Sequence, residues 1–156
     1  MPGQAARSSR PNFAFFHEIR VRWAEVDAQG IVFNPNYFMY ADIAVTEYMR
    51  AVGFPYPQGF AEFGTDTFAV HAAADFHDAA EFDDELSLAV CLARIGRTSF
   101  VFEIGVFRGE QLLTDIALTY VNATREGRTP APVPQAFIDR VLAFEPVPPA
   151  RKRAGD

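Results

Sequence analysis

Apolar and polar residues alternate along most of the chain, with the period of a β-strand that buries one face. Residues 15–23 put apolar side chains and one histidine on one face, and Glu18, Arg20 and Arg22 on the other. Four later segments follow the same rule, the first of them weakly, and short glycine-containing turns separate the last three. These segments are residues 67–76, 86–92, 100–106 and 112–120. The pattern predicts an antiparallel arrangement of strands.

One segment breaks this alternation and predicts a long helix. Asn34 is a favoured N-cap residue, and Pro35 suits the first helical position because that position needs no N–H. The helix should continue to about Val52, where Gly53 supplies the left-handed residue that ends it and Pro55 prevents continuation. Its surface is apolar on nearly every side, apart from a narrow polar stripe formed by Asp42, Thr46 and Arg50. We expect the strands to enclose such a helix.

The order of these elements predicts the fold class. A strand and a long helix precede four strands, and a short helix follows over residues 134–144. This order is typical of an α+β domain in which an antiparallel sheet of about five strands wraps around one long central helix. We expect a single domain over residues 13–145. Residues 1–12 are predicted to be a disordered N-terminal tail, and residues 146–156 a C-terminal tail.

Composition narrows the classes of function. The chain has 156 residues, of which 49% are hydrophobic, so it can bury a full core and is not a disordered protein. Its formal net charge of −6 argues against nucleic acid as a partner, because neutralising phosphates requires a basic surface. No run of roughly 18 apolar residues could cross a membrane, and no signal peptide is visible, so we expect a cytoplasmic protein. The single cysteine, Cys91, excludes an internal disulfide and argues against a cysteine-based zinc site.

Several familiar catalytic patterns are missing from the sequence. No serine lies in a Gly-x-Ser-x-Gly elbow, and no phosphate-binding glycine-rich loop opens a helix. The one candidate metal cluster consists of His71, Asp75, His77 and Asp78. Its spacing matches no compact zinc pattern, so we expect ordinary polar strand residues and no metal. Three adjacent carboxylates at residues 83–85 fit a solvated turn better than a paired acid–base site.

The segment from Asp27 to the predicted helix start carries the best candidate for catalysis. Gly30 allows the backbone to turn sharply and to approach a ligand closely. The helix N-terminus offers N–H donors and a partial positive charge to a polarised carbonyl oxygen. Asp27, folded back on the loop, could then act on the same carbonyl carbon as a general base or a nucleophile. From spacing alone, an ordinary structural loop fits this segment as well.

Residues 23–37, Trp-Ala-Glu-Val-Asp-Ala-Gln-Gly-Ile-Val-Phe-Asn-Pro-Asn-Tyr, closely resemble the signature of hotdog-fold acyl-CoA thioesterases of the 4-hydroxybenzoyl-CoA thioesterase type. The similarity extends to residues 82–86 and 97–100, which open two of the predicted strands, and covers about residues 15–143. It implies a hotdog fold and an acyl-CoA thioesterase that releases a free acid and coenzyme A.

The resemblance also implies roles for individual residues. Asp27 matches the catalytic carboxylate, which attacks the thioester or activates a water, and the backbone N–H of Asn34 matches the donor that polarises its carbonyl. Gly30 matches the glycine of the tight loop, and Tyr37 the aromatic residue of the first helical turn. The residues implied to bind substrate are Tyr37, Arg97, Thr98, Arg125 and Arg128, and the three arginines are implied to meet the coenzyme A phosphates, although each arginine could equally be an ordinary solvated charge.

Members of this family place the active site between two subunits, in homodimers with one continuous sheet that often pair into homotetramers. Coenzyme A is then part of the substrate, and no separate cofactor or metal is expected. Asn34 departs from the commoner aromatic residue or histidine, but its role belongs to the backbone. The strand over residues 67–78 is unusually rich in alanine and histidine and is expected to line the acyl pocket.

Two other functions fit the same fold. A hydratase or dehydratase of acyl thioesters would pair a histidine with a carboxylate near the central helix, yet no histidine lies between Glu18 and Val70. A non-catalytic domain that binds acyl-CoA or lipid would gain nothing from a carboxylate such as Asp27 aimed at a thioester.

Overall fold

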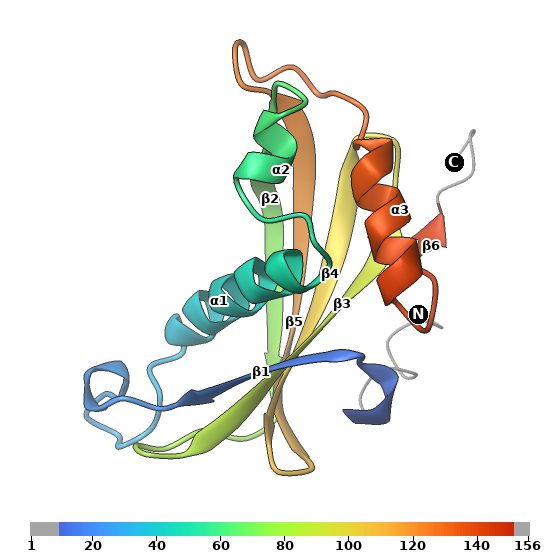
Figure 1. The fold of residues 1–156 in the computed structure, drawn as a ribbon. Helices are drawn as coiled ribbons and strands as arrows, with labels where there is room; N and C mark the ends of the chain where they lie inside the picture. The colour runs from blue at the N-terminus through green and yellow to red at the C-terminus, as the bar shows by residue number, and fades with distance from the viewer. Residues whose placement is uncertain (1–9, 152–156) are drawn as a thin grey trace.

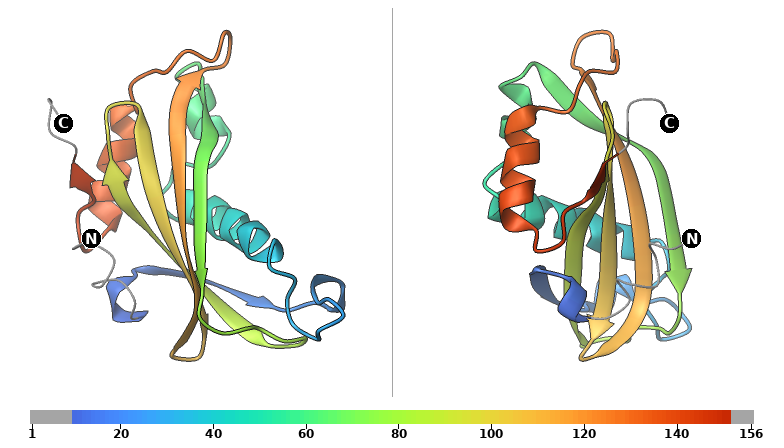
Figure 2. Two further views of the ribbon diagram at one scale, coloured as in Figure 1. Left: turned by 180° about the vertical axis from the view of Figure 1, so that it is seen from behind. Right: turned by 90° about the vertical axis from the view of Figure 1, so that its right-hand side faces the viewer.

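A twisted sheet with all its longer helices on one face forms the body of the protein in the computed structural model, which describes residues 10–151 (Figures 1 and 2). The sheet order is β1-β3-β4-β5-β2, with β6 beside β3. The strands are β1 (Phe15–Arg20), β2 (Thr65–Phe76), β3 (Glu85–Ile95), β4 (Ser99–Arg108), β5 (Gln111–Thr124) and β6 (Ala150–Arg151). The helices are η1 (Arg10–Asn12), η2 (Trp23–Glu25), α1 (Asn36–Ala51), α2 (Gln58–Ala61) and α3 (Gln135–Phe144).

The core lies between α1 and the sheet. Tyr40, Ala44 and Tyr48 on α1 are almost completely buried, and the alternating apolar residues of β3 and β4 meet them from the sheet. Burying one such large apolar side chain is worth ~1.5–3 kcal/mol, so this interface accounts for the enclosure of an almost entirely apolar helix. The predicted α+β architecture, with an antiparallel sheet around one long helix, is confirmed. No helix among residues 10–151 is long and apolar enough to cross a membrane.

The start of α1 differs from the prediction by one residue. The first helical residue is Asn36, and Pro35 takes the N-cap position without a side-chain cap. The N–H groups of Asn36, Tyr37 and Phe38 each bond to a carbonyl three residues earlier, at 2.8–3.2 Å. Tight i−3 bonds therefore replace the side-chain cap that Asn34 was predicted to supply.

β2 is an edge strand of the sheet. It pairs with β5 from Thr65, opposite Thr124, to Phe76, opposite Thr114. Its other edge has no partner among the described residues, and residues 69–73 are exposed, with Val70 at 59%. A long exposed edge is a template for pairing with another strand.

Both predicted tails are partly structured. Residues 1–9 and 152–156 lie outside the described residues. Residues 10–12 form η1, and the guanidinium of Arg10 lies 4.8 Å from the ring centre of Phe16 and donates to the carbonyl of Gly109. At the other end, residues 150–151 pair with β3 as β6. These contacts are made across long sequence separations, which the local composition of the tails does not reveal.

Candidate active site

A tight loop between η2 and α1 holds Asp27. The backbone N–H of Asp27 bonds to the carbonyl of Ile31 at 3.0 Å, and the N–H of Gly30 bonds back to the carbonyl of Asp27 at 2.9 Å. Gly30 adopts a φ of 78°, a left-handed conformation that favours glycine. The Oδ1 of Asp27 accepts the N–H of Gln29 at 2.8 Å, which fixes the half-buried carboxylate and leaves Oδ2 without a partner among residues 10–151.

The backbone N–H of Asn34 is the available donor at the start of α1. The N–H groups of the next residues are already paired within the first turn, and Pro35 has none. Within the described part of the chain, the N–H of Asn34 has no hydrogen-bond acceptor. A free donor at the positive end of a helix is suited to binding a carbonyl oxygen that gains negative charge.

Asn34 opens onto a pocket of about 370 Å³, which the loop after Asp27 and the end of β2 enclose. Tyr37 forms one wall: its ring packs against Phe76 at 5.4 Å between centroids, and its hydroxyl accepts the N–H of Ala80 at 3.0 Å. Burial raises the pKa of Tyr37, which is only 2% exposed, so its hydroxyl stays neutral. Of the predicted residues, Asn34 and Tyr37 line this pocket, and Asp27 and Gly30 lie in the loop that leads into it.

A second pocket, of about 290 Å³, lies further along α1, between the helix and the sheet. Tyr37 of the first pocket and Asp42 of the second are five residues apart, which is ~7.5 Å along a helix axis. The aromatic residues that line it are Tyr56, Phe60, Phe100, Phe102 and Tyr120, and its other lining residues include Thr46, Thr67 and Ala69. Residues of the 67–78 segment, which was predicted to line the acyl pocket, thus line both pockets.

The other four residues predicted to bind substrate lie elsewhere. Arg97 and Thr98 are in the β3–β4 turn, and Arg125 and Arg128 follow β5 at the same end of the sheet, where the N–H of Arg125 bonds to the carbonyl of Gly64. The three arginines are exposed, and the guanidinium carbon of Arg128 lies 5.6 Å from the ring centre of Phe68. Figure 1 shows these turns at one end and the loop before α1 at the other. The two ends of β2 are ~36 Å apart, so one chain does not bring the arginines to Asn34.

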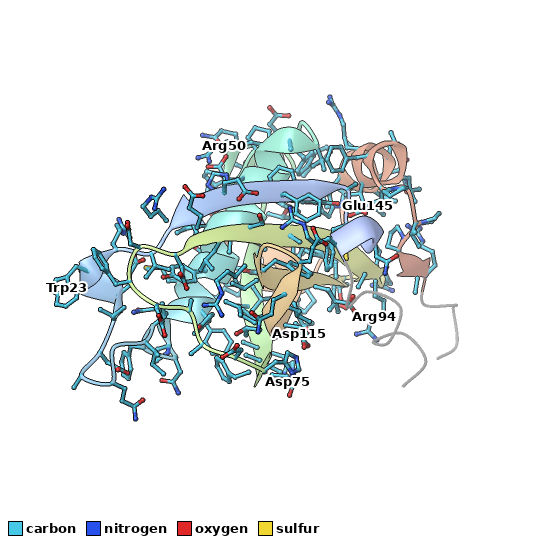
Figure 3. The ribbon with its side chains drawn as sticks, turned by 90° about the horizontal axis from the view of Figure 1, so that it is seen from below. Trp23, Arg50, Asp75, Arg94, Asp115 and Glu145 are labelled. Atoms are coloured by element: carbon cyan, nitrogen blue, oxygen red, sulfur yellow. The ribbon has the colours of Figure 1, made fainter. Side chains whose placement is uncertain are left out.

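The candidate metal cluster does not assemble. His77 Nε2 lies 2.6 Å from the Oδ2 of Asp115, a strand residue directly opposite Asp75. Figure 3 shows Asp75 and Asp115 close together at this end of the sheet, and Trp23, 73% exposed, projecting at its far side. The described residues include no group of three histidine, cysteine or acidic side chains that could hold a metal ion.

The acidic turn at residues 83–85 supports the first pocket from outside. Oδ2 of Asp84 accepts the guanidinium of Arg108 at 2.8 Å and the N–H of Glu81 at 2.9 Å. Arg108 also donates to the carbonyl of Ala79, a residue that lines the pocket. Hydrogen bonding to Asp84 raises the pKa of Arg108. Sequence reasoning missed this arginine, because it ends strand β4, far along the chain from Asp84.

Glu25 was also missed as part of the site. It stands two residues before Asp27 inside the recognised signature, and only 4% of it is exposed. The sequence shows a carboxylate at that position, but it does not show that the side chain is buried against Tyr40, fifteen residues later.

Comparison with known proteins gives the family context of this site. The sequence model of the thioesterase superfamily matches residues 29–114, more than half of the chain. A protein of Aquifex aeolicus is 32% identical over 108 residues, which cover 69% of this chain and 80% of that protein. The 4-hydroxybenzoyl-CoA thioesterase of Pseudomonas sp. strain CBS-3 is 34% identical over 91 residues, covering 57% of this chain and 64% of that enzyme.

Solved structures share the fold. A mutant 4-hydroxybenzoyl-CoA thioesterase in complex with 4-hydroxybenzoyl-CoA superposes with a TM-score of 0.74 at 28% identity, over 81% of this chain and 97% of that one. The predicted hotdog fold is confirmed by this similarity together with the observed sheet order.

Proposed function

Because this chain belongs to the thioesterase superfamily, we propose that it hydrolyses an acyl-CoA or aroyl-CoA thioester to the free acid and coenzyme A, with Asp27 as the catalytic carboxylate. Relatives named 4-hydroxybenzoyl-CoA thioesterase and acyl-CoA thioesterase support this substrate class. The observation that carries the proposal is the unpaired N–H of Asn34, which opens onto a pocket at the start of α1 close in sequence to the carboxylate of Asp27.

In this proposal the thioester carbonyl lies at the start of α1. The N–H of Asn34 donates to its oxygen, and the positive end of the helix stabilises the negative charge that develops there in the transition state. One such donor is typically worth ~3 kcal/mol in the transition state. The acyl group extends along α1 into the second pocket, whose aromatic lining suits an aromatic or medium-chain acyl group.

Two routes are open to Asp27. As a base, its carboxylate takes a proton from a water whose oxygen attacks the carbonyl carbon, and the tetrahedral intermediate then expels the coenzyme A thiolate. As a nucleophile, the carboxylate attacks the carbon itself and expels the thiolate, and water hydrolyses the resulting mixed anhydride. A single turnover in ¹⁸O-labelled water, followed by mass spectrometry of the acid and of the protein, tests the second route. Label in the Asp27 carboxylate shows an anhydride that water attacks at the Asp27 carbon, whereas the base route labels only the acid.

A second copy of the chain would complete the site. Antiparallel pairing of two β2 edges about a twofold axis would place the Thr65 end of one strand beside the Phe76 end of the other. Arg97, Arg125 and Arg128 of one copy would then approach the Asn34 pocket of the other and could bind the coenzyme A phosphates. We therefore propose a homodimer with a continuous sheet, which can pair further into a tetramer.

The test is thiol release by the purified protein from short-, medium- and long-chain acyl-CoAs and from benzoyl-, hydroxybenzoyl- and phenylacetyl-CoA. We expect turnover concentrated on one class, and a loss of at least ~100-fold in Asp27→Asn, the size of a general-base contribution. Asp139→Asn serves as the matched control, since Asp139 accepts the side chain of Gln135 on α3 and lines neither pocket. Near-wild-type turnover in Asp27→Asn would overturn the role of Asp27. No turnover of any thioester would favour a binding domain.

A further inference from the structure

We propose that Glu25 is a positioning residue that fastens the Asp27 loop to α1 through the hydroxyl of Tyr40. The inference rests on the proposed function, because it concerns the residue that holds the catalytic carboxylate in place. It assigns a task to a buried acid that the hydrolytic step itself does not use.

The side chain of Glu25 joins the loop to the helix. Its Oε1 accepts the hydroxyl of Tyr40 at 2.8 Å, on the second turn of α1, and the backbone N–H of Arg22 at 3.0 Å. Its Oε2 accepts the Nε of Arg22 at 2.5 Å. Both carboxylate oxygens are therefore used, and one of them spans from η2 to α1.

The backbone of the same residue makes a second connection. The carbonyl of Glu25 accepts the side-chain Nδ2 of Asn36 at 2.8 Å and the backbone N–H of Phe33 at 2.9 Å. Asp27 lies between these two anchors, Glu25 on one side and Phe33 on the other. These bonds therefore hold both ends of the loop against the start of α1.

The charge on Glu25 suits this task. Burial raises the pKa of Glu25, but the hydrogen bonds from Arg22 and Tyr40 outweigh burial, and the pKa lies below its usual range. The carboxylate is thus ionised at neutral pH, and a charge-assisted hydrogen bond from Tyr40 is stronger than one between neutral groups. A displacement of about 1 Å at a catalytic group can cost ~100-fold in rate.

The same helix offers a matched control. The hydroxyl of Tyr48, two turns beyond Tyr40, donates to Oε1 of the buried Glu145 at 2.6 Å. Both tyrosines are almost fully buried, and each donates to a buried carboxylate. Only the Tyr40 bond reaches the Asp27 loop, because Glu145 instead accepts the N–H of Leu92 in β3.

The experiment compares Tyr40→Phe with Tyr48→Phe in thiol release and in thermal unfolding. We expect both variants to lose stability, and only Tyr40→Phe to lose kcat, by about 10-fold or more, with KM changed less than about twofold. Equal kcat in the two variants would overturn the proposal. If Tyr40→Phe does not fold, Glu25→Gln replaces it, because it keeps the shape of the side chain and removes the charge.

Amide hydrogen exchange gives a readout that does not depend on activity. Peptides covering residues 26–33 should exchange faster in Tyr40→Phe than in Tyr48→Phe, because the bonds at Asp27 and Gly30 open more often. Equal exchange in the two variants would overturn the positioning role of Glu25 even if Asp27→Asn is inactive. Faster exchange in a protein that hydrolyses no thioester would instead support this positioning role and refute the proposed function.

Discussion

The phenolic oxygen of Tyr37 accepts the backbone N–H of Ala80 over 3.0 Å, and so joins the first turn of α1 to the segment between β2 and β3. The carbonyl of Ala80 in turn accepts the N–H of Val32 at 2.8 Å. Ala80 is therefore held on both sides, by the loop that follows Asp27 and by the helix that follows Asn34. One buried residue thus fixes two walls of the pocket at the start of α1.

Tyr37→Phe tests this connection. It leaves the buried N–H of Ala80 without an acceptor, at a cost of ~1–3 kcal/mol in the free energy of unfolding. Urea denaturation measures the loss, which should be equal at about pH 6 and about pH 9 because Tyr37 stays neutral at both. Tyr120→Phe is the control, since its hydroxyl has no hydrogen bond among the described residues. An unchanged unfolding free energy in Tyr37→Phe would show that water replaces the hydroxyl.

Gly30→Ala and Gly109→Ala together test whether backbone strain in the Asp27 loop affects catalysis. Gly30 and Gly109 both have positive φ, and an added Cβ would meet no atom within 4 Å at either position. Each alanine should therefore cost ~1–2 kcal/mol of stability through backbone strain alone. Only Gly30→Ala should also lower kcat, by about 10-fold, because the strain is relieved by moving the bonded carbonyl of Asp27. Equal kcat in both variants would mean that the loop absorbs the strain without moving the carboxylate.

Local signals explain what the sequence could predict. The proline at position 35 and the glycine at position 53 mark the ends of α1 within two residues, and the Asp27-to-Tyr37 motif lies within a single loop and helix turn. The remaining contacts are long-range: Arg108 reaches Asp84, and Tyr40 reaches Glu25, only after the sheet and helix have packed. No local pattern encodes such pairs.

The arginines show a different limit of sequence reasoning. Order along the chain placed Arg97 and Arg125 near strand ends, but it could not say which end of the sheet. Strands β3 and β5 are both antiparallel to β4 and run away from the pocket at the start of α1, so Arg97 and Arg125 finish at the opposite end. In the proposed homodimer a second copy brings them back to this pocket, an arrangement that the sequence of one chain does not reveal.

Val70→Glu tests whether two copies pair through the free edge of β2. Val70 is 59% exposed in the middle of the free edge strand, near the point where a twofold axis would set two copies of β2 side by side. Two glutamates facing each other should repel, so light scattering should report the mass of one chain instead of two. Activity should fall together with assembly, because in the proposed dimer the arginines of one copy serve the pocket of the other. Val147→Glu, about equally exposed but away from this edge, should leave both unchanged. A monomeric wild type with full activity would contradict the shared site.

Thr46→Phe tests whether the pocket between α1 and the sheet holds the acyl group. The hydroxyl of Thr46 donates to the carbonyl of Asp42 one turn earlier. Because Thr46 lines this pocket, a larger side chain at this position should fill part of the space between the aromatic residues. Turnover of aromatic and medium-chain acyl-CoAs should fall at least ~10-fold in kcat/KM, whereas acetyl-CoA, which needs no depth, should be affected less than about twofold.

Glu47→Phe is the control for this variant, because the neighbouring residue on the same helix pairs with Arg50 and does not line the pocket. A ratio of aromatic to acetyl turnover that changes only in Thr46→Phe would assign the acyl group to this pocket. An equal loss for every chain length would mean that the substitution disturbs α1 itself, since a shift of the helix N-terminus slows all thioesters alike. Chain-length dependence therefore decides between a specificity pocket and a general effect on the site at Asn34.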